Sequence, residues 1–276
     1  MSDVSIIIQG PLNEISLKNI PTYKKYGKVI VSCWDGYDEE LLKYIDNDVC
    51  FVSKTLPIVN HYNHCNVYYQ ASSIYSGLEK AKTEFSIKFR SDESYSNLDT
   101  FVKALIENPE CIITGDIYFD HREEQIPLHI SDHAIGSKTK NLLGTFDRVK
   151  DICETTPPST RMAARGKDVL LPPEPLIMLS FLQEIGAAVK SDGQTIHTIW
   201  GGRRTIIDNN ISRRSVELIK NHARIVPTIH MGDVFLNTHG NNPSLHGRPI
   251  KSGSEELRVL TNYGGRFVDI KIGCES

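Results

Sequence analysis

Short runs of β-branched and aromatic residues alternate with helix-length stretches through the first half of the chain. The runs predict strands at 4–9, 28–34, 48–53, 85–89 and 111–119. Apolar residues at helical spacing predict helices at 39–45, 66–82 and 97–106. Strands that alternate with helices favour a largely parallel sheet with helices on both faces. The pattern therefore predicts an α/β fold.

In such sheets, ligands bind outside the carboxyl ends of the strands. The residues that directly follow the predicted strands are therefore the first candidates for a site. They include Gln9, Gly10, Pro11, Asp35, Arg90 and Asp92.

The second half of the chain has a less regular pattern. Helices are predicted near 138–152, at 175–188 with Glu174 at the start, and at 212–222. The long Pro- and Arg-bearing stretch 155–173 and the turn-rich tail 238–253 predict mobile loops. We therefore expect an α/β half at residues 1–125 and an irregular half at 126–276 of the same domain.

Composition narrows the class of protein. The 276 residues are 39% hydrophobic and 24% charged, as in an ordinary globular protein. The formal net charge of −3 argues against a nucleic-acid partner. The N-terminus lacks the basic and apolar regions of a signal peptide, and no apolar run is long enough for a membrane span. We expect a cytoplasmic protein, with peripheral contact to a membrane left open.

Charged residues gather after the predicted strand at 85–89. Asp92 can supply a hard oxygen ligand to a divalent cation that holds a diphosphate. Arg90 can neutralise a phosphate or fix the rotamer of Asp92. A solvated loop with surface ion pairs explains these residues equally well.

The turns after the first two strands offer a weaker signal. Gly10 allows a ligand close to the backbone, and Gln9 or Asp35 can reach a base or ribose. A plain turn explains these residues more readily when they are taken alone. Neither GxGxxG nor GxxxxGK[ST] occurs, which disfavours NAD-dependent and P-loop chemistry.

Two acids of the second half are candidates for accepting a proton. Asp132 follows an apolar segment, and Glu174 opens a predicted helix. A general base needs reach and a suitable pKa, which the sequence does not give. Glu174 is explained at least as well by a favourable interaction with the helix dipole.

Four blocks occur in order along the chain: 5–11 with Gln9-Gly10-Pro11, 31–36 with Trp34, 66–81 with Gln70, Ser73 and Gly77, and 87–92 with Arg90 and Asp92. Together these blocks resemble the WavE lipopolysaccharide-synthesis family. The resemblance covers the first third of the chain and extends more loosely through 130–136 and 173–174.

The resemblance implies a glycosyltransferase of the GT-A type that acts in surface-polysaccharide synthesis. In that fold, an acidic motif after a central strand holds Mn²⁺ or Mg²⁺ on the diphosphate of a sugar nucleotide. Asp92 occupies this position, whereas Arg90 replaces the first Asp of the usual Asp-x-Asp motif. Only Asp92, with Glu93 beside it, remains as a ligand, and the metal dependence stays open.

The expected reaction moves a sugar from a nucleotide-diphosphate donor to a carbohydrate or glycolipid acceptor. Residues 1–125 would bind the nucleotide sugar and residues 126–276 the acceptor. Gln9, Gly10, Pro11 and Asp35 would line the nucleotide end, and Arg90 and Asp92 the diphosphate. Asp132, or Glu174 as second choice, would take the acceptor proton.

Two alternatives stay open. A sugar-phosphate nucleotidyltransferase uses a related sheet, but the loop after the first strand lacks the basic residues that this class needs. A non-catalytic carbohydrate-binding protein could keep the same fold.

Overall fold

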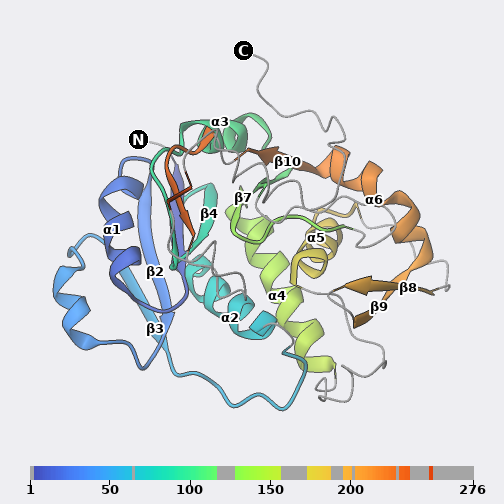
Figure 1. Cartoon of the computed structure of the whole chain (residues 1–276), viewed down its shortest axis with the longest axis horizontal. Helices are drawn as coiled ribbons and strands as arrows, with labels where there is room; N and C mark the ends of the chain where they lie inside the picture. The colour runs from blue at the N-terminus through green and yellow to red at the C-terminus, as the bar shows by residue number, and fades with distance from the viewer. Residues whose placement is uncertain are drawn as a thin grey trace.

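The computed structural model describes residues 3–63, 66–116, 128–156, 173–187, 195–200, 203–227, 230–236 and 249–250 (Figure 1). Its strands are β1 (Val4–Gln9), β2 (Lys28–Trp34), β3 (Cys50–Lys54), β4 (Phe85–Arg90), β5 (Glu93–Tyr95), β6 (Ile112–Gly115), β7 (Ala134–Lys138), β8 (Thr195–Trp200), β9 (Arg203–Asp208), β10 (Ala223–Val226), β11 (Val234–Leu236) and β12 (Pro249–Ile250). The α-helices are α1 (Glu14–Tyr23), α2 (Val67–Leu78), α3 (Asp99–Glu107), α4 (Thr139–Thr155), α5 (Pro173–Glu184) and α6 (Asn209–His222).

A seven-stranded central sheet has the order β10-β6-β7-β4-β1-β2-β3. All neighbouring pairs are parallel except those of β7, which runs antiparallel to β4 and β6. A second sheet has the order β12-β11-β5, and its strand β5 directly follows the turn after β4. Strands β8 and β9 form a separate hairpin.

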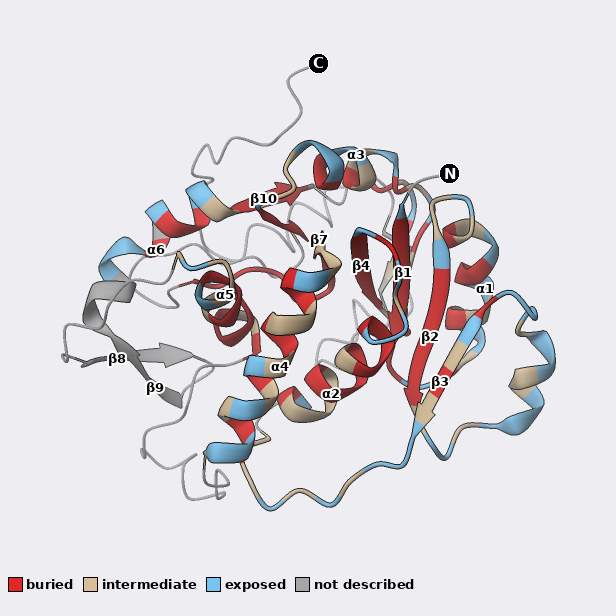
Figure 2. Ribbon diagram, turned by 180° about the vertical axis from the view of Figure 1, so that it is seen from behind, coloured by how far each residue is buried: buried red, intermediate tan, exposed pale blue. Residues whose placement is uncertain are grey.

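Helices cover both faces of the central sheet (Figures 1 and 2). Side chains of a strand alternate between faces, so neighbouring residues of β1 enter different cores. Ile6 and Ile8 pack in a cluster with residues of α1 and α3. Ile7 lies in the opposite cluster with residues of α2, α4, α5 and α6. All of β1 is buried, as expected for a central parallel strand.

Helix α2 lies very close to β1 and β2. A Cβ atom at Gly77 would come within 2.7 Å of Ile7 Cγ2, so a larger residue would push the helix away from the sheet. The Ser32 hydroxyl donates to the Ser73 carbonyl oxygen at 2.6 Å, and the Ser73 hydroxyl donates to the Ser32 carbonyl oxygen at 3.0 Å. These contacts fix the distance between the C-terminal half of α2 and strands β1 and β2.

The predicted fold class is confirmed, since a mostly parallel sheet lies between two helical layers. The strands at 4–9 and 28–34 have the predicted bounds. The predicted helix at 39–45 is a short 3₁₀ helix, Glu39–Tyr44. Strands β7 and β10 were not predicted, although both belong to the central sheet.

The division at residue 125 runs through one sheet, because β7 is inserted between β4 and β6. The assignment of donor and acceptor to the two halves stays a prediction. Most of the predicted loop at 155–173 and of the tail at 238–253 lies outside the described residues. No helix in the described ranges is long and apolar enough to cross a bilayer.

Candidate active site

A cavity of about 530 Å³ opens at the carboxyl ends of β1, β2 and β4. Its lining includes the predicted residues Gln9, Gly10, Pro11, Arg90 and Asp92. Parallel strands β1, β2 and β4 are neighbours, so their carboxyl ends meet at one edge. The structure thus brings together most of the residues that were predicted to bind the donor.

Gly10 shapes this cavity through its backbone. Its φ of +130° is a conformation that L side chains rarely adopt. A Cβ atom there would lie 2.4 Å from Ser91 Oγ. Position 10 therefore requires glycine because the turns after β1 and β4 approach each other closely. This reason holds whether or not a ligand also contacts the Gly10 backbone.

Arg90 and Asp92 form a two-point ion pair at the polar end of the cavity. Arg90 Nε donates to Asp92 Oδ1 at 3.0 Å, and Arg90 Nη2 donates to Asp92 Oδ2 at 2.9 Å. This geometry is the strong, directional form of the guanidinium–carboxylate contact. Arg90 therefore holds Asp92 in its rotamer, which is one of the two roles predicted for it.

The charge of Asp92 is stabilised by this pair. The residue is only 8% exposed. Burial by itself raises the pKa of Asp92, but the hydrogen bonds and charge of Arg90 outweigh burial and lower that pKa below its ordinary value. Asp92 is therefore ionised at neutral pH.

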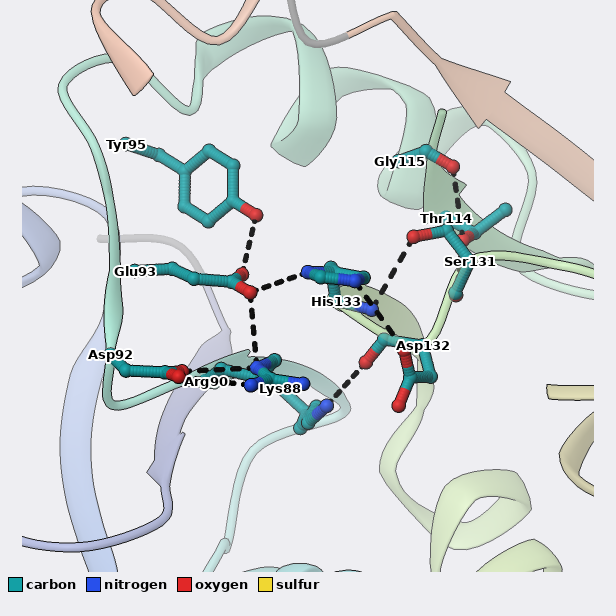
Figure 3. A network of polar contacts seen from close by, with 10 residues as sticks. All are labelled: Lys88, Arg90, Asp92, Glu93, Tyr95, Thr114, Gly115, Ser131, Asp132 and His133. Carbon is teal, nitrogen blue, oxygen red and sulfur yellow. Dashed lines mark hydrogen bonds and ion pairs between the residues drawn. The ribbon is translucent and has the colours of Figure 1, made fainter. Parts of the chain in front are cut away.

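Glu93 connects this pair to the interior of the protein (Figure 3). Its Oε1 is 3.0 Å from Arg90 Nε and also contacts His133 Nδ1, while its Oε2 accepts a hydrogen bond from Tyr95 Oη at 2.9 Å. Only 1% of Glu93 is exposed, and it is not part of the cavity lining. Its carboxylate orients Arg90 from behind, which the sequence did not indicate.

Lys88 and Asp132 lie at the other end of the same network (Figure 3). Both are buried, and Lys88 Nζ donates to the backbone oxygen of Asp132. Burial raises the pKa of Asp132, but Lys88 and His133 outweigh it, so that pKa is lowered overall. Burial is the main reason that the pKa of Lys88 is lowered.

Glu174, in the first turn of α5, lies in a different environment. The residue as a whole is partly buried, but its Oε2 is inaccessible and has no hydrogen-bond partner within the described part of the chain. Burial, followed by the negative charge of Asp132, raises the pKa of Glu174 to about 8. The pKa values of the two predicted acids are therefore shifted in opposite directions, up for Glu174 and down for Asp132.

Neither acid is part of the cavity lining. Asp132 reaches the cavity through a chain of contacts, since His133 Nε2 is 3.8 Å from Asp132 Oδ1 and His133 Nδ1 contacts Glu93. Their catalytic roles stay predictions.

Asp35 lies outside the cavity lining as well. It is exposed at the end of β2, where its carboxylate accepts hydrogen bonds from the hydroxyls of Ser53 and Thr55. These hydrogen bonds, first that of Ser53, lower the pKa of Asp35. Its predicted contact with a nucleotide stays a prediction.

Aromatic residues that were not predicted as site residues also line the cavity, beside β2. Trp34 ends β2, and Tyr69 belongs to the first turn of α2; their ring centroids are 5.9 Å apart in an edge-to-face arrangement. Gln70, beside Tyr69, also lines the cavity. Trp34 and Gln70 both belong to the sequence blocks that carry the resemblance, and this was the available signal.

The described cavity lining offers a divalent cation one carboxylate ligand, so the remaining ligands must come from elsewhere. Asp92 is the carboxylate of the described lining, and no group of three His, Cys, Asp or Glu residues in the described ranges could hold a metal ion. A carboxylate oxygen has two lone pairs and accepts more than one contact. Mg²⁺ often uses one or two carboxylates and takes its other ligands from phosphates and water. Asp92 suits a cation that arrives with a phosphorylated ligand.

Comparisons with known proteins give a fold likeness at low identity. No protein-family profile and no curated protein matches the chain, so the resemblance of the sequence blocks stays a prediction. Solved structures similar to it include HddC from Yersinia pseudotuberculosis, with 12% identity, a TM-score of 0.35, and coverage of 51% of this chain and 78% of that one.

A second similar structure is the mannosyltransferase PcManGT from Pyrobaculum calidifontis in complex with GDP-Man and Mn²⁺. It has 13% identity and a TM-score of 0.36, and the match covers 51% of this chain and 45% of that one. Similarity at this level carries no argument about activity, which must come from the site itself.

Proposed function

We propose that the protein is a glycosyltransferase of the GT-A type that transfers a sugar from a nucleotide-diphosphate donor to a carbohydrate or glycolipid acceptor in surface-glycan synthesis. The observation that carries the proposal is the cavity, whose lining combines the aromatic rings of Trp34 and Tyr69 with the Arg90–Asp92 pair, which ends a strand two positions away in the sheet. A nucleotide has the same two-part chemistry, an aromatic base and an anionic diphosphate.

In the proposed binding mode, the base lies against Trp34 and Tyr69, and the diphosphate lies near Arg90. Gln9, Gly10 and Pro11 contact the nucleotide between these ends. The order of the sequence blocks supports this mode, because their residues come together around the cavity. The described lining has Arg90 as its cationic side chain and no basic residue after β1, which favours a transferase of this type over a nucleotidyltransferase.

In the proposed reaction, the bond between the sugar anomeric carbon and the diphosphate oxygen breaks, and the acceptor oxygen bonds to that carbon. The electron pair of the broken bond stays on the diphosphate. Arg90 stabilises the negative charge that develops there. A cation bound to the diphosphate and Asp92 would add Lewis-acid stabilisation of the same charge.

The local charge supports such a cation. In the described part of the network, the carboxylates Asp92, Glu93 and Asp132 outnumber the basic side chains Lys88 and Arg90. A diphosphate adds further negative charge to this surplus. Mn²⁺ or Mg²⁺ would offset it, and Asp92 would be the protein ligand.

The proton of the acceptor hydroxyl passes to the carboxylate of an acidic residue in the second half of the chain, residues 126–276. A base whose pKa lies near the working pH is the more effective one. The pKa of Glu174, about 8, meets this condition better than the lowered pKa of Asp132. We therefore place Glu174 before Asp132 as the proton acceptor, with Asp132 as the charge that raises the pKa of Glu174.

The test begins with thermal unfolding in the presence of UDP-, GDP-, CMP- and dTDP-sugars, each with and without Mn²⁺. One nucleotide class should raise the midpoint, because a ligand that binds only the folded state stabilises it. The variant Arg90→Lys should lose at least about tenfold in affinity for that nucleotide, since lysine cannot make the two-point pair. The control is Arg214→Lys, which alters a similar pair with Glu217 on the exposed surface of α6.

Transfer is then measured with the selected donor. Sugar transfer or slow donor hydrolysis that falls in Arg90→Lys, but not in Arg214→Lys, supports the proposal. Nucleoside triphosphates are screened in the same way, and stabilisation by these alone would indicate a nucleotidyltransferase. No response to any nucleotide would contradict both enzymatic functions.

A further inference from the structure

A second cavity, of about 380 Å³, is lined by residues of α1, β5 and β11. No described residue lines both this cavity and the one that contains Arg90 and Asp92. Its volume falls in the usual range of small-molecule sites, roughly 300–1,000 Å³. The second cavity is therefore large enough for a ligand of its own.

Regular elements form the walls of the second cavity. Ile15, Asn19 and Thr22 of α1 are spaced by four and three residues, which places them on one side of the helix. Ser94 of β5 and Phe235 of β11 are directly paired in an antiparallel ladder, so their side chains lie on the same face of the small sheet. A helix face and a sheet face thus hold the shape of this cavity.

The lining combines an aromatic ring with hydroxyl and amide groups. Phe235, Thr22 and Ser94 are all half-buried. The hydroxyls of Thr22 and Ser94 make no hydrogen bond within the described part of the chain. Asn19 Nδ2 donates to the Glu93 backbone oxygen at 2.5 Å, which fixes the amide and leaves its Oδ1 as an acceptor. The cavity therefore offers a ligand both an apolar surface and several hydrogen-bonding groups.

This lining suits a neutral carbohydrate. A sugar ring has a face of C–H groups, which packs on an aromatic ring, and hydroxyls at its edge, which need donors and acceptors. Lys18 supplies the only charge of the described lining, and its side chain is 77% exposed and 3.6 Å from Glu14. An anionic ligand would lack a free cation there, and a purely apolar ligand would leave the lining hydroxyls without partners.

The second cavity adjoins the first cavity at two places along the chain. Asn13 lines the first cavity and Ile15 the second, and Asp92 lines the first and Ser94 the second. Two residues of chain span at most about 7 Å, so neighbouring residues contribute to both cavities. A glycan in the second cavity would lie beside the Asp92 side of the first.

We propose that the second cavity binds a carbohydrate and holds the part of the acceptor glycan that does not react. Phe235 packs on a sugar ring, while Asn19, Thr22 and Ser94 form hydrogen bonds with its hydroxyls. Only the identity of this glycan as the acceptor rests on the proposed function.

The test measures binding of three neutral trisaccharides, maltotriose, mannotriose and chitotriose, by calorimetry with the full chain. At least one of them should bind. Phe235→Ala removes the ring and should weaken this binding about tenfold. Thr22→Val keeps the shape of the side chain without its hydroxyl and should weaken binding about fivefold. The controls are Phe51→Ala and Thr100→Val, because both residues are also half-buried but lie in β3 and α3, outside both described linings.

The nucleotide that stabilises the wild type serves as a second probe and should bind equally to all of these variants. If no trisaccharide binds, or if Thr22→Val and Thr100→Val bind it alike, the carbohydrate site is wrong even when sugar transfer is found. If trisaccharide binding depends on Phe235 and Thr22 but no nucleotide binds, the site stands and the proposed function fails. The protein would then be a non-catalytic carbohydrate-binding protein.

Discussion

The cavity and the buried network share Arg90, but they differ in how their polar groups are satisfied. In the network, Glu93 and Lys88 have protein partners within hydrogen-bond reach. In the cavity, Ser91 Oγ and the outer N–H groups of Arg90 have none among the described residues. Buried polar groups are normally hydrogen-bonded in native proteins, and the outer N–H groups of Arg90 are available to a ligand that enters the cavity.

This difference separates the residues that hold the site in shape from the groups that a ligand would contact. Charged residues in both regions look alike in the sequence, and only the contacts distinguish them. Glu93 holds Arg90 from the protein side, whereas the Nη1 protons and one Nη2 proton of Arg90 have no acceptor among the described residues. The predictions below test whether this division holds, beginning with the largest expected effect.

Lys88 should be needed for stability. It is 1% exposed, and its removal would leave the Asp132 charge without its nearest cation. We expect Lys88→Met to lower the free energy of unfolding by about 3 kcal/mol in urea denaturation, because the buried Asp132 loses the positive charge that stabilises it most and its backbone oxygen loses a hydrogen bond. Lys138→Met is the control, since Lys138 pairs with an exposed Glu110 and should matter by less than about 1 kcal/mol. Equal stability of the two variants would mean that Lys88 does not compensate Asp132.

The sequence predicted the architecture well in the first half of the chain, where strands and helices alternate regularly. The strands at 4–9 and 28–34 are mostly apolar runs, and such runs are typical of central parallel strands. Strand β7 was missed because Ala134–Lys138 is short and weakly apolar. Its place between β4 and β6 depends on tertiary pairing, which local pattern does not report.

The site was predicted in part. Gln9, Gly10, Pro11, Arg90 and Asp92 line one cavity because each follows a strand of the same sheet edge. Tyr69 was missed because its position in α2 looks like any helical aromatic residue. Ser73 and Gly77 of the same sequence block contact the sheet instead, so a block can combine binding and packing residues.

Glu174 should make stability depend on pH. Its folded pKa of about 8 exceeds the ordinary 4.5, so the folded state holds more protons than the unfolded state between these values. Stability from this group is complete below about pH 4.5 and is lost as the pH rises through about 8. We expect the wild type to lose about 1–2 kcal/mol more than Glu174→Gln between pH 6 and 8.5.

The comparison for this pH series is Glu184→Gln, which removes a carboxylate from the same helix where it pairs with Arg148. This variant should keep the pH dependence of the wild type. The same dependence in all three proteins would show that Glu174 ionises normally and would remove the pKa argument for its role as base.

The aromatic end of the cavity should give the smallest effect. Trp34→Ala removes a ring beside Tyr69, and stacking on a base typically contributes about 1 kcal/mol or more. We expect about fivefold weaker binding of the selected nucleoside diphosphate in calorimetry, with pyrophosphate binding unchanged. Tyr37→Ala is the control, because Tyr37 packs on Phe51 and is not in the cavity lining. Equal losses for the nucleotide and for pyrophosphate would show that Trp34 shapes the whole cavity, and the separation between a base end and a phosphate end would then be wrong.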